Sequence, residues 1–409
     1  MNAKVQHSTG RWPLRKNCPT SRLDPFALEF LQDPYPHYES LREAGPVVWI
    51  DKYKFVAMTR YQHVRGALDD WETYCSSRGV GLTDFATEEP WRPPSIILEA
   101  DPPLHTRTRG VLGKVLSKPA LQALSDDFKR TADELVGGLI AKGEIDAVCD
   151  LAEAFPLSVF PDAIGLRKDG RENLLPYGNM AFNAFGPRNE LFEAAFTNAQ
   201  PVVQWITEQC QRAALAPGGI GEQVYKAADD GKVTEEEAGL LVRSLLTAGL
   251  DTTILGLSGA LYCFATSPDQ WRVLRENPEL VGGAFEEAVR FVSPVQTFMR
   301  TTTRPLEVEG IELTEGQKVF LSLASANRDP RQWEQPDLFD IRRKTMGHVG
   351  FGHGIHVCAG QMFARLEAQV LLTALAERVE RIELTGAPEW RLNNTLRGLD
   401  RLPIRLVAS

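Results

Sequence analysis

One cysteine near the C-terminus, Cys358, stands in a sequence that suits a metal ligand. It lies in the glycine-rich stretch 351–360, and a helix-forming stretch follows from Gln361. Unpaired backbone N–H groups and the positive end of a helix dipole stabilise a thiolate at such a place. The glycines let the backbone approach a flat, bulky group and donate hydrogen bonds to the sulfur. A thiolate held in this way suits haem-thiolate oxygen activation, whereas a lone cysteine without this setting is usually a packing residue.

A second segment, residues 248–253, could move protons. Gly249 lowers helix stability and Thr252 is β-branched, so helix propensity does not explain either residue. In one interpretation Gly249 ends a helix and Asp251 caps the next one. In the other, Gly249 leaves room above a haem for a small ligand, Thr252 supplies a hydroxyl beside dioxygen, and Asp251 helps to deliver protons from solvent.

A third pair, His105 and Arg109, is cationic. The two residues are four apart, on one face of an expected helix, where positive side chains repel each other unless an anion lies between them. A haem offers two carboxylates for such a place. Either residue alone is more simply an ordinary solvated charge.

The pattern Phe-x-x-Gly-x-x-x-Cys-x-Gly resembles the haem-binding loop of the cytochrome P450 family. Phe351, Gly354, Cys358 and Gly360 occupy its four defining positions. The resemblance implies haem b as cofactor, with Cys358 as the axial ligand of its iron.

Other segments match the same family in the same order, from about residue 20 to the C-terminus. Asp251 and Thr252 are similar to its acid–alcohol pair, which implies that they are catalytic. Glu287 and Arg290 resemble its Glu-x-x-Arg element, which implies a folding role and contact with residues 326–339. The residues that resemble the family's propionate-binding cations are His105, Arg109, Arg300 and His356.

Helical periodicity dominates the chain, so we expect a mainly α protein with small antiparallel β-sheets, as in the P450 fold. Thr234 and Glu237 form a capping-box pattern that starts a long central helix, reaching to about Phe264. Further helices are expected over residues 120–141, 201–215, 278–292 and 360–382, and strands over residues 47–50, 54–58, 319–322 and 403–407.

Composition limits the cellular setting and the partners. The chain has 409 residues, 43% of them apolar, and a net charge of −9, which argues against nucleic acid and anionic membranes as partners. No linker or repeat marks a boundary, so we expect one domain over residues 21–409 after a polar tail over residues 1–20. The scattered cysteines and the polar N-terminus favour a cytoplasmic protein.

The source of electrons must be another protein, because the sequence contains no glycine fingerprint for NAD(P)H or flavin. The resemblance implies an iron–sulfur ferredoxin served by an NADH-dependent ferredoxin reductase. Such partners are commonly acidic, so we expect a local basic patch. Its candidate residues are Arg107, Lys114 and Lys118.

The expected substrate pocket combines hydroxyl, guanidinium and aromatic side chains. Ser244 and Ala248 precede Thr252 by eight and four residues, which places all three on one helix face. Ser244 and Thr252 are then about 12 Å apart along the helix axis. The pattern resembles the bacterial P450 subgroup that oxidises para-substituted benzoates such as 4-methoxybenzoate. The residues expected to hold the carboxylate are Arg92, Ser95, Arg243 and Ser244, and those expected to complete the pocket are Leu98, Phe182, Phe185, Ala248 and Phe298.

Four alternatives remain open at this point. The enzyme could oxidise another small hydrophobic substrate, such as a terpenoid or a fatty acid. The chain could be a haem-thiolate gas-binding protein without catalysis, although a sensor needs no Asp251–Thr252 pair. A peroxide-driven haem enzyme would more naturally carry a carboxylate or an arginine in place of Thr252. The last alternative is an unrelated helical binding protein with a buried cysteine.

Overall fold

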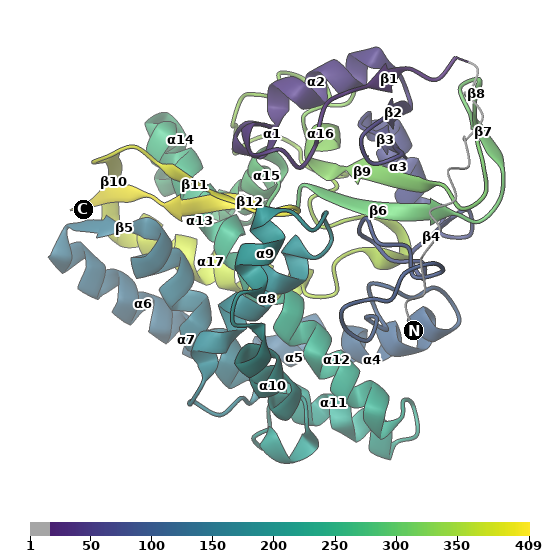
Figure 1. Ribbon diagram of the computed structural model, residues 1–409. Helices are drawn as coiled ribbons and strands as arrows, with labels where there is room; N and C mark the ends of the chain where they lie inside the picture. The colour runs from purple at the N-terminus through teal and green to yellow at the C-terminus, as the bar shows by residue number, and fades with distance from the viewer. Residues whose placement is uncertain (1–16) are drawn as a thin grey trace.

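The computed structural model describes residues 17–409 of the chain. Helices predominate; the largest sheet and the β7–β8 pair lie at the upper right of Figure 1, and the strands β5 and β10 to β13 lie toward its left. The expected fold class is confirmed. The longer helices are α2 (Tyr35–Ala44), α3 (Tyr61–Asp69), α4 (Leu104–Val115), α6 (Ser125–Lys142), α7 (Ala154–Ile164), α8 (Leu174–Asn183), α10 (Ala199–Gln209), α11 (Ile220–Asp229), α12 (Glu235–Ala248), α13 (Asp251–Thr266), α14 (Pro268–Glu276), α15 (Val281–Val292) and α17 (Gln361–Arg378).

Short helices connect these elements. The short α-helices are α1 (Leu28–Gln32), α5 (Lys118–Gln122), α9 (Glu190–Phe196) and α16 (Leu323–Asn327). The remaining turns of helix are the π-helix η1 (Ala147–Glu153) and the 3-10 helices η2 (Arg171–Asn173), η3 (Arg212–Ala214), η4 (Pro278–Leu280) and η5 (Gly354–His356).

The largest sheet has six strands in the order β1-β2-β3-β9-β6-β4. It is mixed rather than purely antiparallel, because β1 runs parallel to β2 and β3 runs parallel to β9. The three smaller sheets have the orders β10-β13-β5, β11-β12 and β7-β8. The strands are β1 (Thr20–Ser21), β2 (Val48–Ile50), β3 (Phe55–Met58), β4 (Tyr74–Cys75), β5 (Glu144–Asp146), β6 (Thr297–Thr302), β7 (Leu306–Val308), β8 (Ile311–Leu313), β9 (Lys318–Ser322), β10 (Val379–Leu384), β11 (Glu389–Leu392), β12 (Arg397–Arg401) and β13 (Pro403–Ala408).

Strand β6 carries two residues toward the same side of the sheet. Phe298 and Arg300 are two positions apart, and side chains with this spacing share a face of a strand. Their register is fixed by β9, where Leu321 pairs with Phe298 and Val319 pairs with Arg300. Both Phe298 and Arg300 line the cavity described below.

The expected central helix is two helices, which is a correction. The capping box at its start is confirmed, since the Thr234 side chain accepts from the Glu237 backbone and the Glu237 side chain accepts from the Thr234 backbone. Helix α12 ends at Ala248, with Gly249 as its C-cap, and α13 begins at Asp251. Gly249 therefore does end a helix, as one interpretation held. The second part of that interpretation, in which Asp251 caps the next helix, is wrong, because the N-cap of α13 is Leu250.

Gly249 is required by close packing at this junction. A Cβ atom added there would lie 2.5 Å from the ring of Phe160 and 2.8 Å from the carbonyl oxygen of Leu245. Both distances are too short for any side chain to fit without a shift. The glycine thus allows α12 and α13 to meet beside the cavity.

The Glu-x-x-Arg pair has the contacts that its resemblance implied. Glu287 and Arg290 are fully buried on α15 and form two hydrogen bonds, of 2.7 and 2.8 Å. Arg290 also donates to the carbonyl oxygens of Asn327 and Pro336, in the segment that leads to the cysteine loop. Arg343 donates to Glu287 from the same side. The pair therefore ties α15 to the irregular segment before Cys358.

Several element boundaries differ from the sequence expectations. The stretch 120–141 is divided between α5 and α6, α10 begins and ends earlier than the expected range 201–215, and residues 278–280 form η4 ahead of α15. The helix expected to reach residue 382 ends at Arg378, because Val379 starts strand β10.

The last residues of the N-terminal tail expected over residues 1–20 belong to the fold. Pro19 accepts a hydrogen bond from the backbone of Trp49, and Thr20 pairs with Trp49 in the sheet. The chain therefore joins the fold from about this point. The rest of the expected tail lies outside the described residues.

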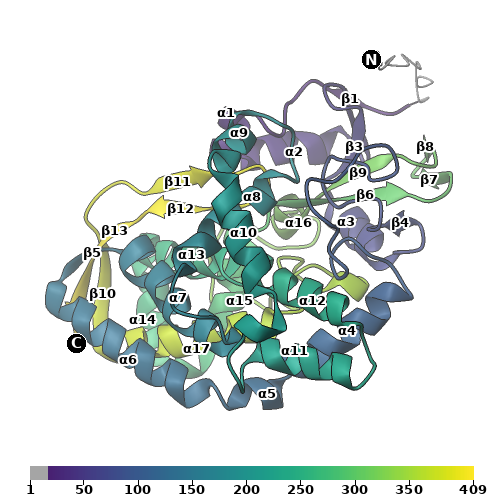
Figure 2. The ribbon, with the colours of Figure 1, turned by 60° about the horizontal axis from the view of Figure 1, so that its bottom comes forward.

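The segment Glu235–Thr266 is long and apolar enough to cross a membrane by composition alone. Its apolar window is 61% buried inside the protein, where α13 packs against α15. Figures 1 and 2 both show its second half, α13, among the other helices of the molecule. The apolar half of the segment, α13, is thus a core helix.

Candidate active site

One cavity of about 240 Å³ brings together nearly all the residues that the sequence singled out. Residues of α12 and α13 line it together with the cysteine loop, and apolar side chains provide most of its wall. The predicted residues that line it are Arg92, Ser95, Leu98, Arg109, Phe182, Phe185, Arg243, Ser244, Ala248, Thr252, Phe298, Arg300, His356 and Cys358. His105 and Asp251 are the two predicted residues that do not line this cavity.

The cysteine loop has the local geometry that favours a thiolate ligand. The backbone of Cys358 donates to the carbonyl oxygen of Phe351 at 2.7 Å, and α17 begins three residues later, at Gln361. Burial raises the pKa of the Cys358 thiol, while the N–H groups of Gly360 and Gln361 act in the opposite direction. The start of α17 therefore directs donors at the sulfur, as the sequence indicated.

Gly354 allows this loop to pack closely. Its φ is +67°, in the region that favours glycine, and an added Cβ atom would lie 2.4 Å from the carbonyl oxygen of Leu68. A side chain at this position would displace the loop from the end of α3.

A group of basic side chains lies close to the cysteine loop. The rings of His105 and His356 are 4.4 Å apart, and the Nε2 atoms of both are buried without a hydrogen bond, although Asp101 Oδ1 lies 3.9 Å from the Nε2 of His356. Burial lowers the pKa of His105 to about 4, with further lowering from His356 and Arg109. Burial likewise lowers the pKa of Arg300 to about 10.

These orphaned donors fit the carboxylates of a haem. A buried donor without an acceptor is costly, and two carboxylates beside the rings would supply acceptors. His356 lines the cavity, whereas His105 does not line it and packs against the ring of His356. The residues present therefore fit the cofactor that Cys358 implies.

Thr252 and Asp251 are neighbours in the chain but face different spaces. The hydroxyl of Thr252 donates to the carbonyl oxygen of Ala248 at 2.8 Å and lines the main cavity. Asp251 is buried and lines a small adjoining cavity together with Asn179, Arg391 and Asn393. The first two residues of α13 thus face two different cavities.

The surroundings of Asp251 keep its proton available near neutrality. Burial raises the pKa of the carboxyl to about 7, and the guanidinium of Arg391, 3.9 Å from Oδ1, partly offsets this effect. Gly178 on α8 leaves space for the group, because a Cβ atom there would lie 1.8 Å from Oδ2. Such a carboxyl can both give and take a proton around pH 7.

Two serines, Ser95 and Ser244, are in contact at the part of the cavity that α12 lines. The hydroxyl oxygens of Ser95 and Ser244 lie 3.2 Å apart. Ser244 also lies 2.9 Å from the carbonyl oxygen of Leu240, which can only accept, so its hydrogen is donated there. Ser95 then donates to Ser244 and accepts from the backbone of Leu98 at 3.1 Å.

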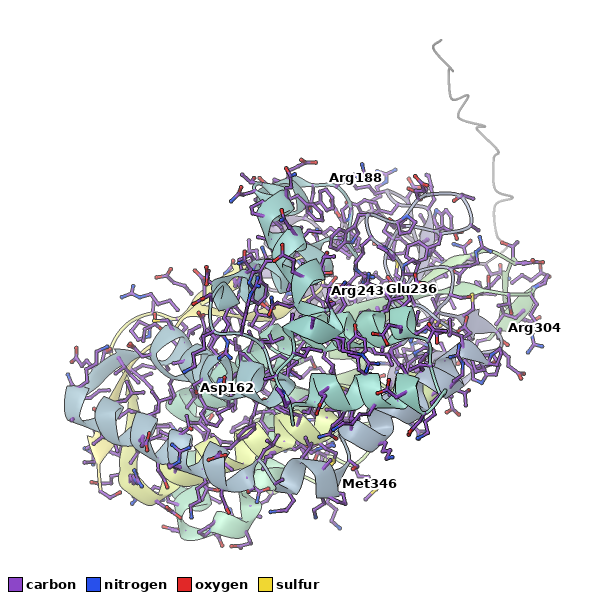
Figure 3. All side chains as sticks on the ribbon, turned by 90° about the horizontal axis from the view of Figure 1, so that it is seen from below. Asp162, Arg188, Glu236, Arg243, Arg304 and Met346 are labelled. Atoms are coloured by element: carbon purple, nitrogen blue, oxygen red, sulfur yellow. The ribbon has the colours of Figure 1, made fainter. Side chains whose placement is uncertain are left out.

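Two arginines lie around the serine pair. Arg243, labelled on α12 in Figure 3, donates to the carbonyl oxygens of Pro93 and Pro94 and so holds the loop that carries Ser95. Arg92 donates to Glu99 at 3.0 Å, and its Nε is buried without a partner. An unused buried donor at the cavity wall is suited to an anionic ligand.

Three phenylalanines form the aromatic wall that the sequence predicted. The ring centroids of Phe182 and Phe185 are 5.9 Å apart, and those of Phe185 and Phe298 are 5.8 Å apart, both in edge-to-face geometry. Leu98 and Val295 pack against the same cluster. The wall is therefore apolar and built from the end of α8 and the residues just after it, which supply Phe182 and Phe185, and from β6, which supplies Phe298.

A network of amides fixes α8, which carries Phe182, to the turn of the β11–β12 hairpin. The backbone of Asn394 donates to the side chain of Asn183, and its side chain donates to the carbonyl oxygen of Asn183 and to the side chain of Asn189. Thr395 donates to the carbonyl oxygen of Phe182. Figure 2 shows the hairpin ending beside α8.

The basic patch proposed from the sequence needs one correction. Arg107 is not available as a free cation, because its guanidinium makes two hydrogen bonds of 2.6 Å to Glu237 at the start of α12. The sequence does not reveal this ion pair, because Arg107 and Glu237 are 130 positions apart. Lys114 on α4 and Lys118 on α5 are exposed and remain candidates.

Sequence reasoning missed Glu99 and Arg391 as members of the site. Glu99 belongs through two contacts within its own loop, to the backbone of Ser95 and to Arg92, and Arg391 belongs through one contact between separate parts of the fold, to Asp251. No local pattern marks either residue. Other lining residues that it missed are Ile97, Leu245, Thr247 and Val295.

Comparison with known proteins agrees with this geometry. Residues 219–386 match the family model described as Cytochrome P450. Over 385 residues the chain is 58% identical to cytochrome P450 CYP199A2 of Rhodopseudomonas palustris, which covers 94% of this chain and 93% of that protein. The chain belongs to the cytochrome P450 family. It is thus a haem-thiolate monooxygenase that uses O₂ and electrons from a redox partner, with Cys358 supplying the thiolate.

More distant P450s share the fold over nearly the whole chain. The β-dihydromenaquinone-9 ω-hydroxylase of Mycobacterium tuberculosis is 32% identical, covering 97% of this P450 and 80% of that protein. A solved structure of cytochrome P450 CREJ in complex with (4-ethylphenyl) dihydrogen phosphate has a TM-score of 0.85 and 26% identity, covering 94% and 98% of the two chains. The P450BioI structure with a fatty-acid-bearing acyl carrier protein has a TM-score of 0.83 and 27% identity, covering 92% and 100%.

Proposed function

We propose that this P450 oxidises a small aromatic carboxylic acid at the para substituent, with 4-methoxybenzoate as the model substrate. The observation that carries the proposal is the serine pair, Ser95 and Ser244, placed with Arg92 and Arg243 at the wall of an otherwise apolar cavity. The reaction is O-demethylation. One 4-methoxybenzoate, one O₂, two electrons and two protons give 4-hydroxybenzoate, formaldehyde and water.

The carboxylate finds donors at this end of the cavity. A hydroxyl hydrogen of Ser95 or Ser244 can turn from its present acceptor to a ligand oxygen, because hydroxyl groups rotate freely. The unpartnered Nε–H of Arg92 offers a further, charged donor. Hydrogen bonds to an ionised group contribute about 1.5–3 kcal/mol each. A neutral ligand would leave the charged donor without an acceptor.

The position of the anchor directs the other end of the substrate. Ser244 and Ala248 line the cavity from one face of α12, and Thr252 lines it from the first turn of α13. A benzoate is rigid, so fixing its carboxylate near Ser244 points its para group along the cavity toward the cysteine side. Phe182, Phe185 and Phe298 hold the ring between these ends.

Asp251 and Thr252 deliver protons in this proposal. The bound haem supplies the oxygen-activating chemistry. Asp251 takes protons from the small cavity that it shares with Arg391, and its carboxyl can release them near pH 7. The Thr252 hydroxyl faces the main cavity and holds the proton donor or water that serves the reaction there.

Electrons come, in this proposal, from an acidic iron–sulfur ferredoxin reduced by an NADH-dependent reductase. The net charge of −9 would repel an acidic partner, so a local positive surface must steer it. Lys114 and Lys118 are exposed on two successive helices and are the proposed contacts. We place the enzyme in the cytoplasm, because no cysteine of the described chain forms a disulfide.

A further observation from the comparisons supports an aromatic anion as substrate. The solved P450 CREJ structure holds a para-substituted aryl phosphate, which is also a ring with an acidic group opposite an alkyl group. The test is product analysis with ferredoxin, reductase and NADH. The proposal predicts 4-hydroxybenzoate and formaldehyde in equal amounts from 4-methoxybenzoate, and no turnover of that acid would refute it.

A further inference from the structure

We infer that Glu99 sets the charge of the anion that this cavity accepts, so that the site is matched to a monoanion and disfavours a dianion such as an aryl phosphate. The inference rests on the proposed carboxylate site and adds a residue that determines its specificity. Glu99 is a positioning and charge-setting residue that need not touch the substrate.

Glu99 contacts two of the proposed anchors directly. Its side chain is 4% exposed, and its Oε2 accepts from the backbone of Ser95 at 2.6 Å and from the guanidinium of Arg92 at 3.0 Å. A buried carboxylate so close to a proposed anion site is unexpected unless it has a role there, because like charges in a buried space repel each other.

The charges around the serines add up to a single positive charge. Two guanidinium groups, Arg92 and Arg243, and one carboxylate, Glu99, make up the cluster. The pKa of Arg243 is lowered by burial and by Arg92, and Glu99 opposes that lowering, so the three groups act on one another. The other ionisable groups that line the cavity belong to the haem site. They are Arg109, Arg300, His356 and Cys358.

A benzoate, with one negative charge, neutralises this cluster. An aryl phosphate carries about −1.5 to −2 at pH 7 and would leave unbalanced negative charge beside Glu99. In a cavity with few polar groups such an imbalance is poorly screened and therefore weakens binding. Discrimination of this kind works through a repulsive group, which is a common way to obtain specificity.

Glu99 also determines which donor of Arg92 stays available. The Nη1 atom of Arg92 is used by Glu99 and by the carbonyl oxygen of Pro93, whereas Nε has no partner. The two roles of Glu99 can be separated by Glu99→Gln. Glutamine keeps the size of the side chain and an oxygen acceptor for Ser95 and Arg92, but removes the charge.

The experiment is a calorimetric titration of the haem-loaded enzyme with 4-methoxybenzoate, its methyl ester and 4-methoxyphenyl phosphate. The native enzyme should bind the benzoate more tightly than the phosphate. In Glu99→Gln the ratio of the two dissociation constants should shift toward the phosphate by about tenfold or more, as expected for removing one nearby like charge. Binding of the ester should stay within about twofold of native.

The matched control is Glu89→Gln, which removes the same charge from an exposed position earlier in the chain. It should leave the benzoate-to-phosphate ratio unchanged. A ratio that is also unchanged in Glu99→Gln, or equal weakening of all three ligands, would overturn the inference while the carboxylate site stands. Equal binding of acid and ester by the native enzyme would instead overturn the proposed function, and the inference with it.

Discussion

The hydroxyl oxygens of Ser95 and Ser244 lie 3.2 Å apart, although 149 positions separate the two residues in the chain. One belongs to the loop after Trp91 and the other to α12, so their contact closes the loop over the cavity. Because Ser244 donates to Leu240, a ligand anion must turn one of the two hydroxyls to be bound. The contact is therefore both a structural link and a set of donors held ready for an acceptor.

Thr252→Ala should separate electron use from product formation. The hydroxyl faces the main cavity, and its loss removes the group that holds the proton donor there. We expect native haem content and native affinity for 4-methoxybenzoate, with at least about a tenfold loss in product formed per NADH, within the range for proton-transfer groups. Hydrogen peroxide should account for the missing electrons. Unchanged coupling of NADH use to product would show that Thr252 has no such role.

Asp251→Asn should change the pH dependence of stability. Burial raises the pKa of Asp251 from 3.8 to about 7, so the folded protein holds a proton there that the unfolded chain releases. Stability from this group is therefore present at low pH and is lost as the pH rises toward 7. Between pH 5 and 8, the free energy of unfolding of Asp251→Asn should rise by about 3 kcal/mol relative to the native protein.

Urea denaturation at both pH values measures this difference. Asp269→Asn is the control, because Asp269 is 84% exposed, and it should follow the native protein at both pH values. If Asp251→Asn also keeps the native pH dependence, Asp251 does not titrate in the folded protein as described.

Glu287→Gln should destabilise the fold strongly. The carboxylate is fully buried and accepts from both Arg290 and Arg343. Its replacement leaves buried positive charge without a partner, which costs about 3–5 kcal/mol. Glu134→Gln is the matched control, because Arg130 and Glu134 form an exposed pair four residues apart, worth less than about 0.5 kcal/mol. Urea midpoints and haem content measure both variants, and equal midpoints would contradict the folding role.

Charge reversal at the two lysines should slow reduction by the ferredoxin. Lys114→Glu with Lys118→Glu removes the attraction proposed to steer an acidic partner, so the second-order rate at low salt should fall about tenfold or more. The dependence of that rate on salt should also become flatter. The double change Arg107→Gln with Glu237→Gln should affect the rate little, because it removes a neutral ion pair and leaves the net charge of the surface unchanged. Stopped-flow reduction tests this, and an unchanged rate in the double variant would remove the proposed surface.

Local sequence rules predicted the parts of this enzyme that depend on neighbours in the chain. Thr234 and Glu237 form the expected capping box because both bonds join residues three apart. The donors that face Cys358 belong to the helix that follows it directly. The Glu287–Arg290 pair has the same local character, although its carbonyl partners lie 37 and 46 residues beyond Arg290.

Contacts that depend on loop conformation or on distant segments could not be predicted in the same way. Glu99 and Arg391 matter because of the side chains that the fold places beside them, Arg92 and Asp251. The break between α12 and α13 at Gly249 likewise depends on Phe160, whose ring occupies the space that a Cβ atom at Gly249 would need. In each case the residue type is unremarkable in sequence; a neighbour from another element sets the role of Arg391 and Gly249, and the irregular conformation of one loop brings Glu99 to Arg92.

The central claim is that the cavity binds a carboxylate, and a spin-state titration with 4-methoxybenzoate and its methyl ester tests it most directly. The native enzyme should bind the acid at least about tenfold more tightly than the ester, since one charge-assisted hydrogen bond is worth about 1.5–3 kcal/mol. Ser244→Ala should weaken binding of the acid about tenfold and leave the ester nearly unchanged. Equal affinities of the native enzyme for acid and ester would contradict the account.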